Sequence, residues 1–301
     1  MQASVGGELR FLGVGVHRGI SAEAVIKPAG PDTGIVFQRT DLVRQGSHSH
    51  HQASISARYD SVCDTRLCTV IGNTDGATVS TIEHVMAALA AHGIDNALIE
   101  IDGPEMPIMD GSSAAFCDAL SKVERIEFPK PSRALRILKK VEVVDGDKSA
   151  ALMPSRQFEL SFEIDFPDAA IGRQASAIVM GRDAFDRELA AARTFCRRHE
   201  IEQLRAAGLA RGGSLENAVV VDGAEVLNPE GLRYRDEFVR HKLLDAVGDL
   251  RLAGAPILGR YRGIRAGHGI TNQLLRALFA DPTAWGWVEA PATQPLASQE
   301  R

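Results

Sequence analysis

The stretch QFELSFEIDF, residues 157–166, alternates apolar and polar residues without interruption. Successive side chains of a β-strand point to opposite faces, so one face of this strand would be wholly apolar: Phe158, Leu160, Phe162, Ile164 and Phe166. The later stretch DEFVRHKLLDAVGDLRL, residues 236–252, instead predicts a helix with an apolar stripe. A short apolar strand is expected between them, over residues 218–221. The second half of the chain therefore contains strands followed by helices.

The first half shows the same order. Short strand-like runs broken by glycine come first, and residues 80–92 then change to a helical period. Their apolar residues recur at i, i+3, i+4 and i+7, the spacing of one helical face: Ile82, Val85, Met86 and Leu89. Residues 98–101 predict a further strand. Strands followed by helices in each half favour an α+β fold over alternating βαβ units.

Helix ends and a domain boundary can also be predicted. Ser80 and Glu83 match a capping box at the start of the first helix, and Gly93 is suited to its end. Ser112 or Ser113 can cap the next helix, which would run through Leu120.

Two prolines within Phe128–Ser132 would stop both helices and strands. We therefore expect an N-terminal domain over 1–128, a C-terminal domain over 133–290 and a flexible tail over 291–301.

Composition excludes several classes of protein. At about 150 residues per domain, 301 residues agree with two domains. Lys and Arg number 34 against 39 Asp and Glu, giving a net charge of −5, whereas a nucleic-acid-binding protein usually has a basic balance. No run of 18 apolar residues or signal peptide is visible, and the four cysteines are irregularly spaced. These features predict a cytoplasmic protein without stable membrane insertion.

The helix over residues 236–252 carries the strongest chemical signal. Glu237, His241, Asp245 and Asp249 are spaced by four and would share one face. A histidine and an aspartate at i and i+4 can reach one metal ion, and zinc accepts both ligand types. The alternative is a solvated helix face with one histidine on it, because such pairs are common on exposed helices.

Two other histidines could take part in chemistry. His84 follows Glu83, and a carboxylate beside a metal ligand can accept a proton from water, although the capping box would explain Glu83 equally well. His268 lies between two glycines, and near Asp249 its imidazolium form would be favoured, as a general acid requires; alternatively it is an exposed loop residue. The group His48–His51 predicts a solvated loop rather than a catalytic site.

With these residues in view, the chain resembles the UDP-3-O-acyl-N-acetylglucosamine deacetylases, zinc amidases of lipid A biosynthesis. The resemblance covers roughly residues 8–280 and includes long matching stretches: GVGVHRG (13–19), DTRLCT (64–69), STIEHVMAALAAHGIDNALIEIDGPEMPIMDGS (80–112), ARTF (192–195), LARGGSLENAVVVD (209–222) and LNPEGLRYRDEFVRHKLLDAVGDLRLAGAPILG (227–259). It implies hydrolysis of the N-acetyl group of UDP-3-O-(3-hydroxyacyl)-N-acetylglucosamine.

The resemblance also implies roles for individual residues. One Zn²⁺ per chain would be bound by His84, His241 and Asp245. The catalytic groups would be Glu83 as general base, His268 as general acid, Asp249 orienting His268, and Thr194 at the oxyanion. Substrate contacts would come from Lys242 at the sugar-phosphate region, Phe166 at the uracil and Arg265 at the nucleotide. Phe195 and Gly213 would line the site, and an acyl-chain passage would be formed by Leu209, Ala210, Ser214, Ala218 and Val220.

The resemblance further implies two α+β domains whose helices are sandwiched between two sheets, with the site at the domain interface. We expect a monomer that binds no nucleic acid and contacts the inner membrane transiently. The segments Asp165–Ala169 and Cys196–Glu200 depart from the family pattern. A zinc amidohydrolase acting on a different acylated sugar nucleotide, or a non-catalytic zinc-binding module, therefore remains an alternative.

Overall fold

The computed structural model describes residues 1–290, so the predicted tail over 291–301 lies outside the described residues. The helices are α1 (Thr40–Arg44), α2 (Glu83–Ala91), α3 (Ala114–Ser121), α4 (Arg182–Glu188), α5 (Arg198–Ala206), α6 (Glu237–Arg251) and α7 (His268–Ala280), with a 3₁₀ turn, η1, at Tyr59–Ser61. The strands of the first half are β1 (Ala3–Val5), β2 (Leu9–Val14), β3 (Ser21–Pro28), β4 (Ile35–Arg39), β5 (Ser54–Ser56), β6 (Val62–Asp64), β7 (Val70–Gly72), β8 (Thr78–Val79), β9 (Ala97–Ile101) and β10 (Arg125–Glu127). Those of the second half are β11 (Arg133–Ile137), β12 (Val141–Asp145), β13 (Lys148–Met153), β14 (Phe158–Asp165), β15 (Arg173–Val179), β16 (Phe195–Arg197), β17 (Val219–Asp222), β18 (Glu225–Val226), β19 (Ile257–Ile264) and β20 (Trp285–Glu289).

Two larger sheets and several small ones make up the β structure. The first larger sheet has the order β2-β3-β9-β4-β5. The second runs β12-β13-β19-β11-β20, and β14 joins it beside β19 and carries β15. Both mix parallel and antiparallel pairs, because β4 runs parallel to β9, and β19 runs parallel to β11 and β14. The predicted α+β class is confirmed as a mixed fold of several sheets packed with helices.

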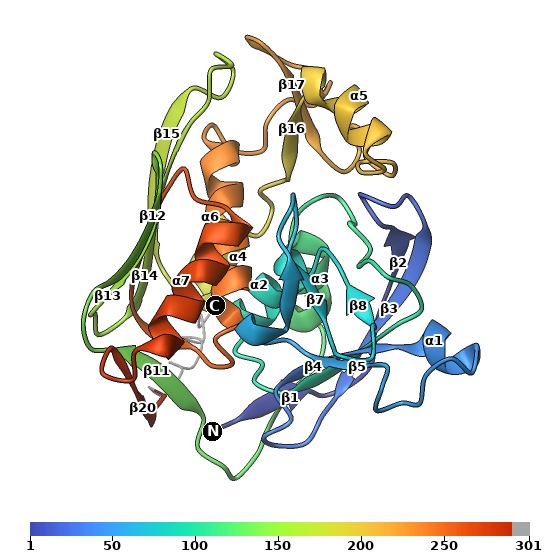
Figure 1. Ribbon diagram of the computed structural model, residues 1–301, viewed down its shortest axis with the longest axis vertical. Coiled ribbons are helices and arrows are strands. Elements are labelled where there is room, and N and C mark those ends of the chain that lie inside the picture. Colours follow the sequence, from blue (N-terminus) through green and yellow to red (C-terminus); the bar gives the residue numbers. More distant parts are fainter. Residues whose placement is uncertain (291–301) are drawn as a thin grey trace, which may run out of the picture.

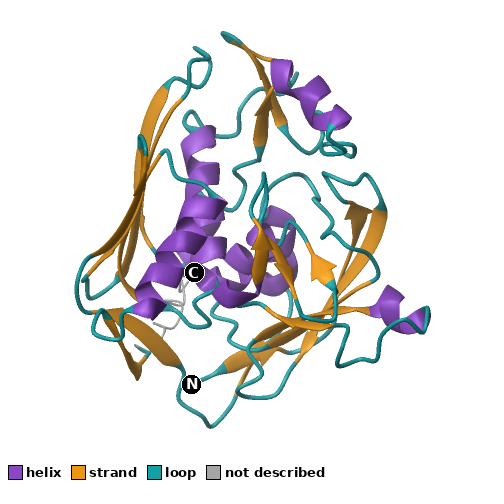
Figure 2. Ribbon diagram, viewed as in Figure 1, coloured by secondary structure: helices purple, strands orange, loops and turns teal. Residues whose placement is uncertain are grey.

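Helices occupy the middle of the molecule. In Figure 1, α2, α6 and α7 lie between the strands β12–β15 on one side and β2–β5 on the other, and Figure 2 shows the same layers by secondary structure. Helix α6 packs against β14 and β15, α7 against β12 and β13, and α2 against α6. None of the helices within residues 1–290 has the length and apolar character needed to cross a membrane.

The contact between α2 and α6 is unusually close at Gly248. A Cβ placed on that glycine would lie 2.0 Å from the backbone oxygen of Glu83, so only a residue without a side chain allows the two backbones to meet there. This contact sets the distance between the two helices that carry the predicted metal ligands.

The elements with clear periodicity are confirmed. The alternating stretch 157–166 forms β14, with Leu160, Phe162 and Ile164 buried. The stretch 236–252 forms α6, and residues 98–101 and 218–221 fall in or beside β9 and β17.

Of the predicted caps, Gly93 is confirmed and the capping box is wrong. Gly93 follows α2 with φ +64° and donates to the carbonyl of Ala90, while Ile94 donates to that of Leu89, the pattern of a Schellman motif. Helix α2 begins at Glu83 itself, and neither Ser80 nor Glu83 caps it. The Ser80 hydroxyl bonds to the carbonyl of Pro104 instead, because a long-range partner replaces the local one.

The two serines before α3 have separate partners. The Ser112 hydroxyl accepts a hydrogen bond from the Ala114 N–H at 3.1 Å, so Ser112 satisfies the start of the helix. The Ser113 hydroxyl donates to the backbone carbonyl of His84 at 2.8 Å. The second serine therefore links α3 to a predicted metal ligand on α2.

Candidate active site

Helices α2 and α6 bring the three predicted metal ligands together. His84 is the second residue of α2, and His241 and Asp245 are one turn apart on α6. The Oδ1 atom of Asp245 lies 3.3 Å from Nε2 of His241 and 3.6 Å from Nε2 of His84. All three side chains are buried. Their ligand atoms lie within 4.8 Å of one another, so the group could hold one metal ion.

The protonation states of these groups favour a cation. Nδ1 of His241 lies 3.0 Å from the carbonyl of Ala192, which makes it the donor and leaves the lone pair of Nε2 facing Asp245. Burial lowers the pKa of His241 to about 3, so its imidazole is neutral. Asp245 Oδ1 has no hydrogen-bond partner within residues 1–290. A buried carboxylate oxygen without a donor beside two imidazole nitrogens fits a divalent metal such as zinc.

Lys242 lies beside this group. Its Nζ is 2.6 Å from Oδ2 of Asp245, so the two carboxylate oxygens of Asp245 face different partners. Burial acts to raise the pKa of Asp245, but interactions with His241 and Lys242 hold it well below its usual range. Asp245 is therefore ionised at neutral pH.

A second polar group adjoins the first. His268 begins α7, and its Nδ1 lies 2.8 Å from Oδ2 of Asp249. Its other nitrogen, Nε2, lies 3.9 Å from Oε1 of Glu83. Thr69 connects the two carboxylates: its N–H donates to Glu83 Oε2 at 3.1 Å and its hydroxyl to Asp249 Oδ1 at 2.5 Å. The prediction that His268 approaches Asp249 is confirmed.

The electrostatics of this group favour one acid and one base. Burial disfavours the charged form of His268, but Asp249 and Glu83 outweigh that effect and raise the pKa of the imidazole to about 9. Burial raises the pKa of the Glu83 carboxyl above its ordinary value. Two adjacent groups with shifted pKa values in this arrangement are typical of a catalytic acid and base.

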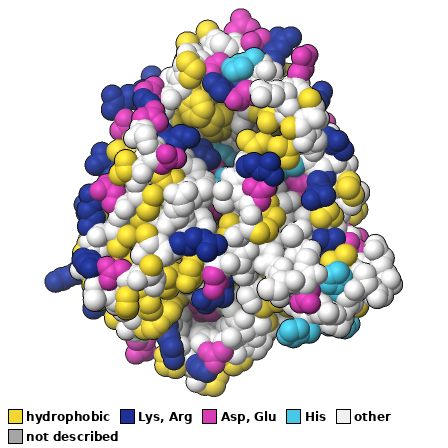
Figure 3. Space-filling view, in the orientation of Figure 1, with side chains coloured by type: hydrophobic (Ala, Val, Ile, Leu, Met, Phe, Trp, Pro, Cys, Tyr) yellow, Lys and Arg dark blue, Asp and Glu magenta, His cyan; other side chains and the backbone are white. Residues whose placement is uncertain are grey.

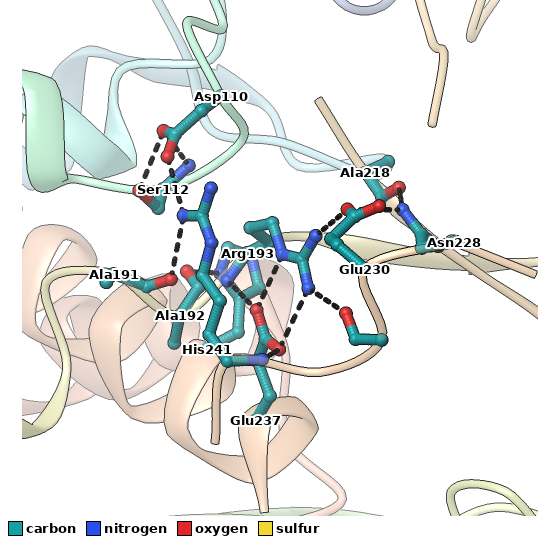
Figure 4. Close-up of polar contacts among 12 residues, drawn as sticks. Asp110, Ser112, Ala191, Ala192, Arg193, Ala218, Asn228, Glu230, Glu237 and His241 are labelled. Atoms are coloured by element: carbon teal, nitrogen blue, oxygen red, sulfur yellow. Dashed lines mark hydrogen bonds and ion pairs between the residues drawn. The ribbon is translucent and has the colours of Figure 1, made fainter. Parts of the chain in front are cut away.

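The segment before β16 is fixed to the start of α6 by a buried ion pair (Figure 4). The Arg193 guanidinium and backbone N–H both donate to Glu237, with Nε and N at 2.9 and 3.0 Å from Oε1. Further donor bonds reach the Glu230 carboxylate and the Gly231 carbonyl. Glu237 shares a helical face with the ligands as predicted, but its partner is Arg193. This clamp positions the Ala192 carbonyl that orients His241.

Aromatic side chains extend from the metal ligands. The ring of Phe195 lies 6.4 Å from that of His241 and 5.6 Å from that of Phe166, edge-on in both cases. The guanidinium of Arg197 lies 5.8 Å from the centre of the Phe166 ring. Thr194 precedes Phe195, and its backbone bonds to Gly111 and Val219. Thr194, Phe195 and Phe166 thus lie along one path from the ligands.

The remaining predicted contacts come from the loop before β17 and from the end of β19. The N–H groups of Arg211 and Gly212 donate to the carbonyls of His17 and Val16, so the loop containing Ala210, Gly213 and Ser214 packs on residues 15–19. Ala218 and Val220 are buried around β17. The Arg265 guanidinium pairs with Asp147 and Asp165.

Several functional neighbours were missed at the sequence level. Thr69 and His17 fall in stretches that carry the family resemblance, but no spacing assigns them a role. Glu105 accepts hydrogen bonds from the N–H groups of His17 and Arg18 at 2.8 Å each, and Nδ1 of His17 has no partner within residues 1–290.

In the loop His48–His51, His48 bonds to the carbonyl of Asp75 at an exposed position, in agreement with the prediction of a solvated loop.

The geometry defines a class of protein. Two imidazoles and one carboxylate could provide three ligands to a metal ion, the number found in catalytic zinc sites, where water takes the fourth position. A carboxylate and a carboxylate-bound histidine stand beside them. This combination is that of a metal-dependent hydrolase.

The comparison with known proteins identifies the family. The sequence model of LpxC, UDP-3-O-acyl N-acetylglycosamine deacetylase, matches residues 2–280. UDP-3-O-acyl-N-acetylglucosamine deacetylases from Phenylobacterium zucineum, Shewanella loihica and Myxococcus xanthus are 56%, 48% and 47% identical to the chain. The alignments cover 91%, 94% and 92% of this chain and 92%, 91% and 86% of the respective relatives. The chain belongs to this family of zinc-dependent deacetylases of lipid A biosynthesis.

Proposed function

We propose that this chain hydrolyses the N-acetyl group of UDP-3-O-(3-hydroxyacyl)-N-acetylglucosamine, giving acetate and UDP-3-O-acyl-glucosamine. The observation that carries the proposal is the meeting of a base and an acid beside three metal ligands: Glu83 Oε1 and His268 Nε2 are 3.9 Å apart. Family membership supplies the substrate, and the geometry supports the residue roles that follow.

His84, His241 and Asp245 would hold one zinc ion per chain. When bound, zinc supplies Lewis acidity, which lowers the pKa of water and polarises an amide carbonyl. The unpartnered Oδ1 of Asp245 and the fixed tautomer of His241 support this ligand set.

Glu83 acts as the general base. Thr69 holds one oxygen of its carboxylate, which leaves Oε1 directed toward His268 and the ligands. Burial raises the pKa of its carboxyl group, which makes the carboxylate a stronger base than an exposed one. Glu83 takes a proton from the attacking water.

His268 acts as the general acid. Asp249 binds its Nδ1 and keeps the ring protonated at neutral pH, so Nε2 carries the proton that can be transferred. An amine is a poor leaving group unless it is protonated, and Nε2 of His268 gives its proton to the departing sugar nitrogen. Thr194 donates a hydrogen bond to the developing oxyanion. Its position next to Phe195 and near the metal ligands supports this role.

The substrate extends along the residues beyond the ligands. Phe195 and Gly213 line the site, Lys242 contacts the sugar-phosphate region, and Phe166 stacks on the uracil. Arg265 contacts the nucleotide. To do so, its guanidinium would have to leave its ion pairs with Asp147 and Asp165. The acyl passage is formed by Leu209, Ala210, Ser214, Ala218 and Val220.

We further propose that the chain divides into domains over 1–128 and 133–290, with helices sandwiched between two sheets and the site at their interface. Glu83 and His84 come from the first part and His241, Asp245 and His268 from the second. The hydrogen bond from Thr69 to Asp249 joins the parts at the site. A monomer, a cytoplasmic location and transient contact with the inner membrane stay predictions. Positive and negative side chains are interspersed over the face shown in Figure 3, which offers no support for a nucleic-acid partner.

The test is acetate release from UDP-3-O-(3-hydroxyacyl)-N-acetylglucosamine by the purified chain, before and after chelation and with zinc added back. Turnover that chelation removes and zinc restores is expected. Glu83→Gln should keep bound zinc and lose turnover by 10²-fold or more, an order of magnitude typical of a general base. No turnover of the zinc-loaded wild type would overturn the assignment and direct attention to other acylated sugar nucleotides.

A further inference from the structure

A second group of metal-ligand side chains lies outside the proposed mechanism. His92 directly follows α2, Cys117 lies in α3 and Asp186 lies in α4. Their ligand atoms all lie within 4.8 Å of one another, and Nε2 of His92 is 3.3 Å from Oδ1 of Asp186. Three helices therefore direct an imidazole nitrogen, a thiol and a carboxylate at one point. We propose that His92, Cys117 and Asp186 bind a second divalent transition-metal ion, of which Zn²⁺ is the natural example.

The spacing agrees with metal coordination. With bonds of about 2.0–2.3 Å, the ligands of a tetrahedral zinc ion lie roughly 3.3–3.7 Å from one another. His92 and Asp186 already have that separation, and the Cys117 sulfur lies within 4.8 Å of both of their ligand atoms. The three residues supply three ligands, and water would complete the tetrahedron.

The chemistry of the ligands selects the metal. A thiolate and an imidazole favour zinc, cobalt and similar ions over calcium and magnesium, which prefer oxygen ligands. The Cys117 thiol gives its proton to solvent when the metal binds. Thiolate and carboxylate together neutralise the charge of a divalent ion, so the buried complex carries no net charge.

The surroundings are those of a built site. The His92 side chain is 4% exposed and Cys117 is buried, whereas the Asp186 side chain is 35% exposed and gives an ion access from solvent. Arg182 lies 3.6 Å from Oδ2 of Asp186 and fixes the carboxylate with Oδ1 toward His92. The carboxyl end of α2, where His92 lies, also favours a cation.

The site is separate from the active site. His92 lies eight positions after His84, just past the end of α2, which is about 12 Å along a helix that rises 1.5 Å per residue. The second metal would hold α2, α3 and α4 together behind the catalytic group. It is expected to raise thermal stability and to leave the catalytic metal in place.

Cobalt distinguishes the two sites. Within the described residues, the active-site ligands include no cysteine, so a sulfur-to-cobalt charge-transfer band in the near ultraviolet reports the second site alone. The full chain, freed of metal by chelation, is titrated with Co²⁺ and followed by absorbance and by bound equivalents. Two equivalents are expected, the second accompanied by the band and by a rise in Tm.

Variants make the result decisive. Cys117→Ser should lose the band and the second equivalent while keeping the first, and Asp186→Asn, which retains the thiol, should weaken the second site by about tenfold or more. Cys63→Ser is the matched control, because Cys63 is an exposed free cysteine outside the group, and it should keep the band. Binding of only one equivalent without the band, or a band that survives Cys117→Ser, would overturn the proposal whether or not the chain shows deacetylase activity.

Discussion

The Thr69 hydroxyl donates a 2.5 Å hydrogen bond to Oδ1 of Asp249, across 180 positions of sequence. The N–H of the same residue donates to Glu83. Thr69 thus binds both Asp249, the partner of the proposed acid, and Glu83, the proposed base, and fixes the distance between these two carboxylates.

Replacing Thr69 by valine should slow the reaction without unfolding the protein. Valine keeps the shape and the backbone N–H but removes the hydroxyl, so Asp249 loses one donor and His268 is held less well. We expect kcat to fall by about 10- to 100-fold, the usual effect of removing a group that orients a catalytic one, with little change in KM. Thr74→Val, at an exposed position, is the control. A Thr69→Val enzyme with wild-type kcat would show that this bond has no role in positioning.

The dependence of kcat/KM on pH should be bell-shaped. The base must be deprotonated, so activity should rise with pH through the pKa of Glu83, which lies above its ordinary value. The acid must be protonated, so activity should fall as pH rises through the pKa of His268, about 9. Asp249→Asn removes the charge that raises this pKa and should move the alkaline limb to lower pH. A profile without limbs between pH 5 and 10 would refute the pair.

Gly248→Ala should disturb the metal site through the backbone. The added methyl group would lie 2.0 Å from the Glu83 carbonyl, so α2 and α6 must separate. We expect a loss of about 1–3 kcal/mol in unfolding free energy, typical of overpacking, together with weaker metal binding. Gly30→Ala is the matched control, since a methyl group there meets nothing within 4 Å. Denaturation and bound-metal measurements check both, and equal stability of the two variants would contradict the proposed close contact.

Arg193→Met should be the most destabilising of these changes. It leaves the Glu237 carboxylate, which is fully buried, without its cationic partner, and breaking a buried pair in this way costs about 3–5 kcal/mol. Chemical denaturation measures the loss. The double variant Arg193→Met with Glu237→Leu removes both charges and should recover part of it. If the unfolding free energy of Arg193→Met lies within about 1 kcal/mol of the wild-type value, the ion pair does not anchor the segment before β16.

The sequence alone determined the features that depend on local geometry. The strand over 157–166 and the helix over 236–252 follow from the period of their apolar residues. Placement of His241 and Asp245 on one side of α6 follows from helical geometry, since residues four apart share a face. Gly93 ends α2 for a similarly local reason, because glycine adopts a positive φ readily. The resemblance then added the family and its expected residue roles.

Only the tertiary structure decided which side chains meet across long distances in sequence. The capping box failed because Ser80 and Glu83 find better partners in Pro104 and Thr69, and no local pattern reveals such competition. Likewise, Glu237 has the spacing of a ligand, yet its partner is Arg193. Hydrogen-bond partners and burial depend on how separate elements pack, so the contacts of Thr69, the pKa values of Glu83 and His268, and the second ligand group are properties of the folded chain.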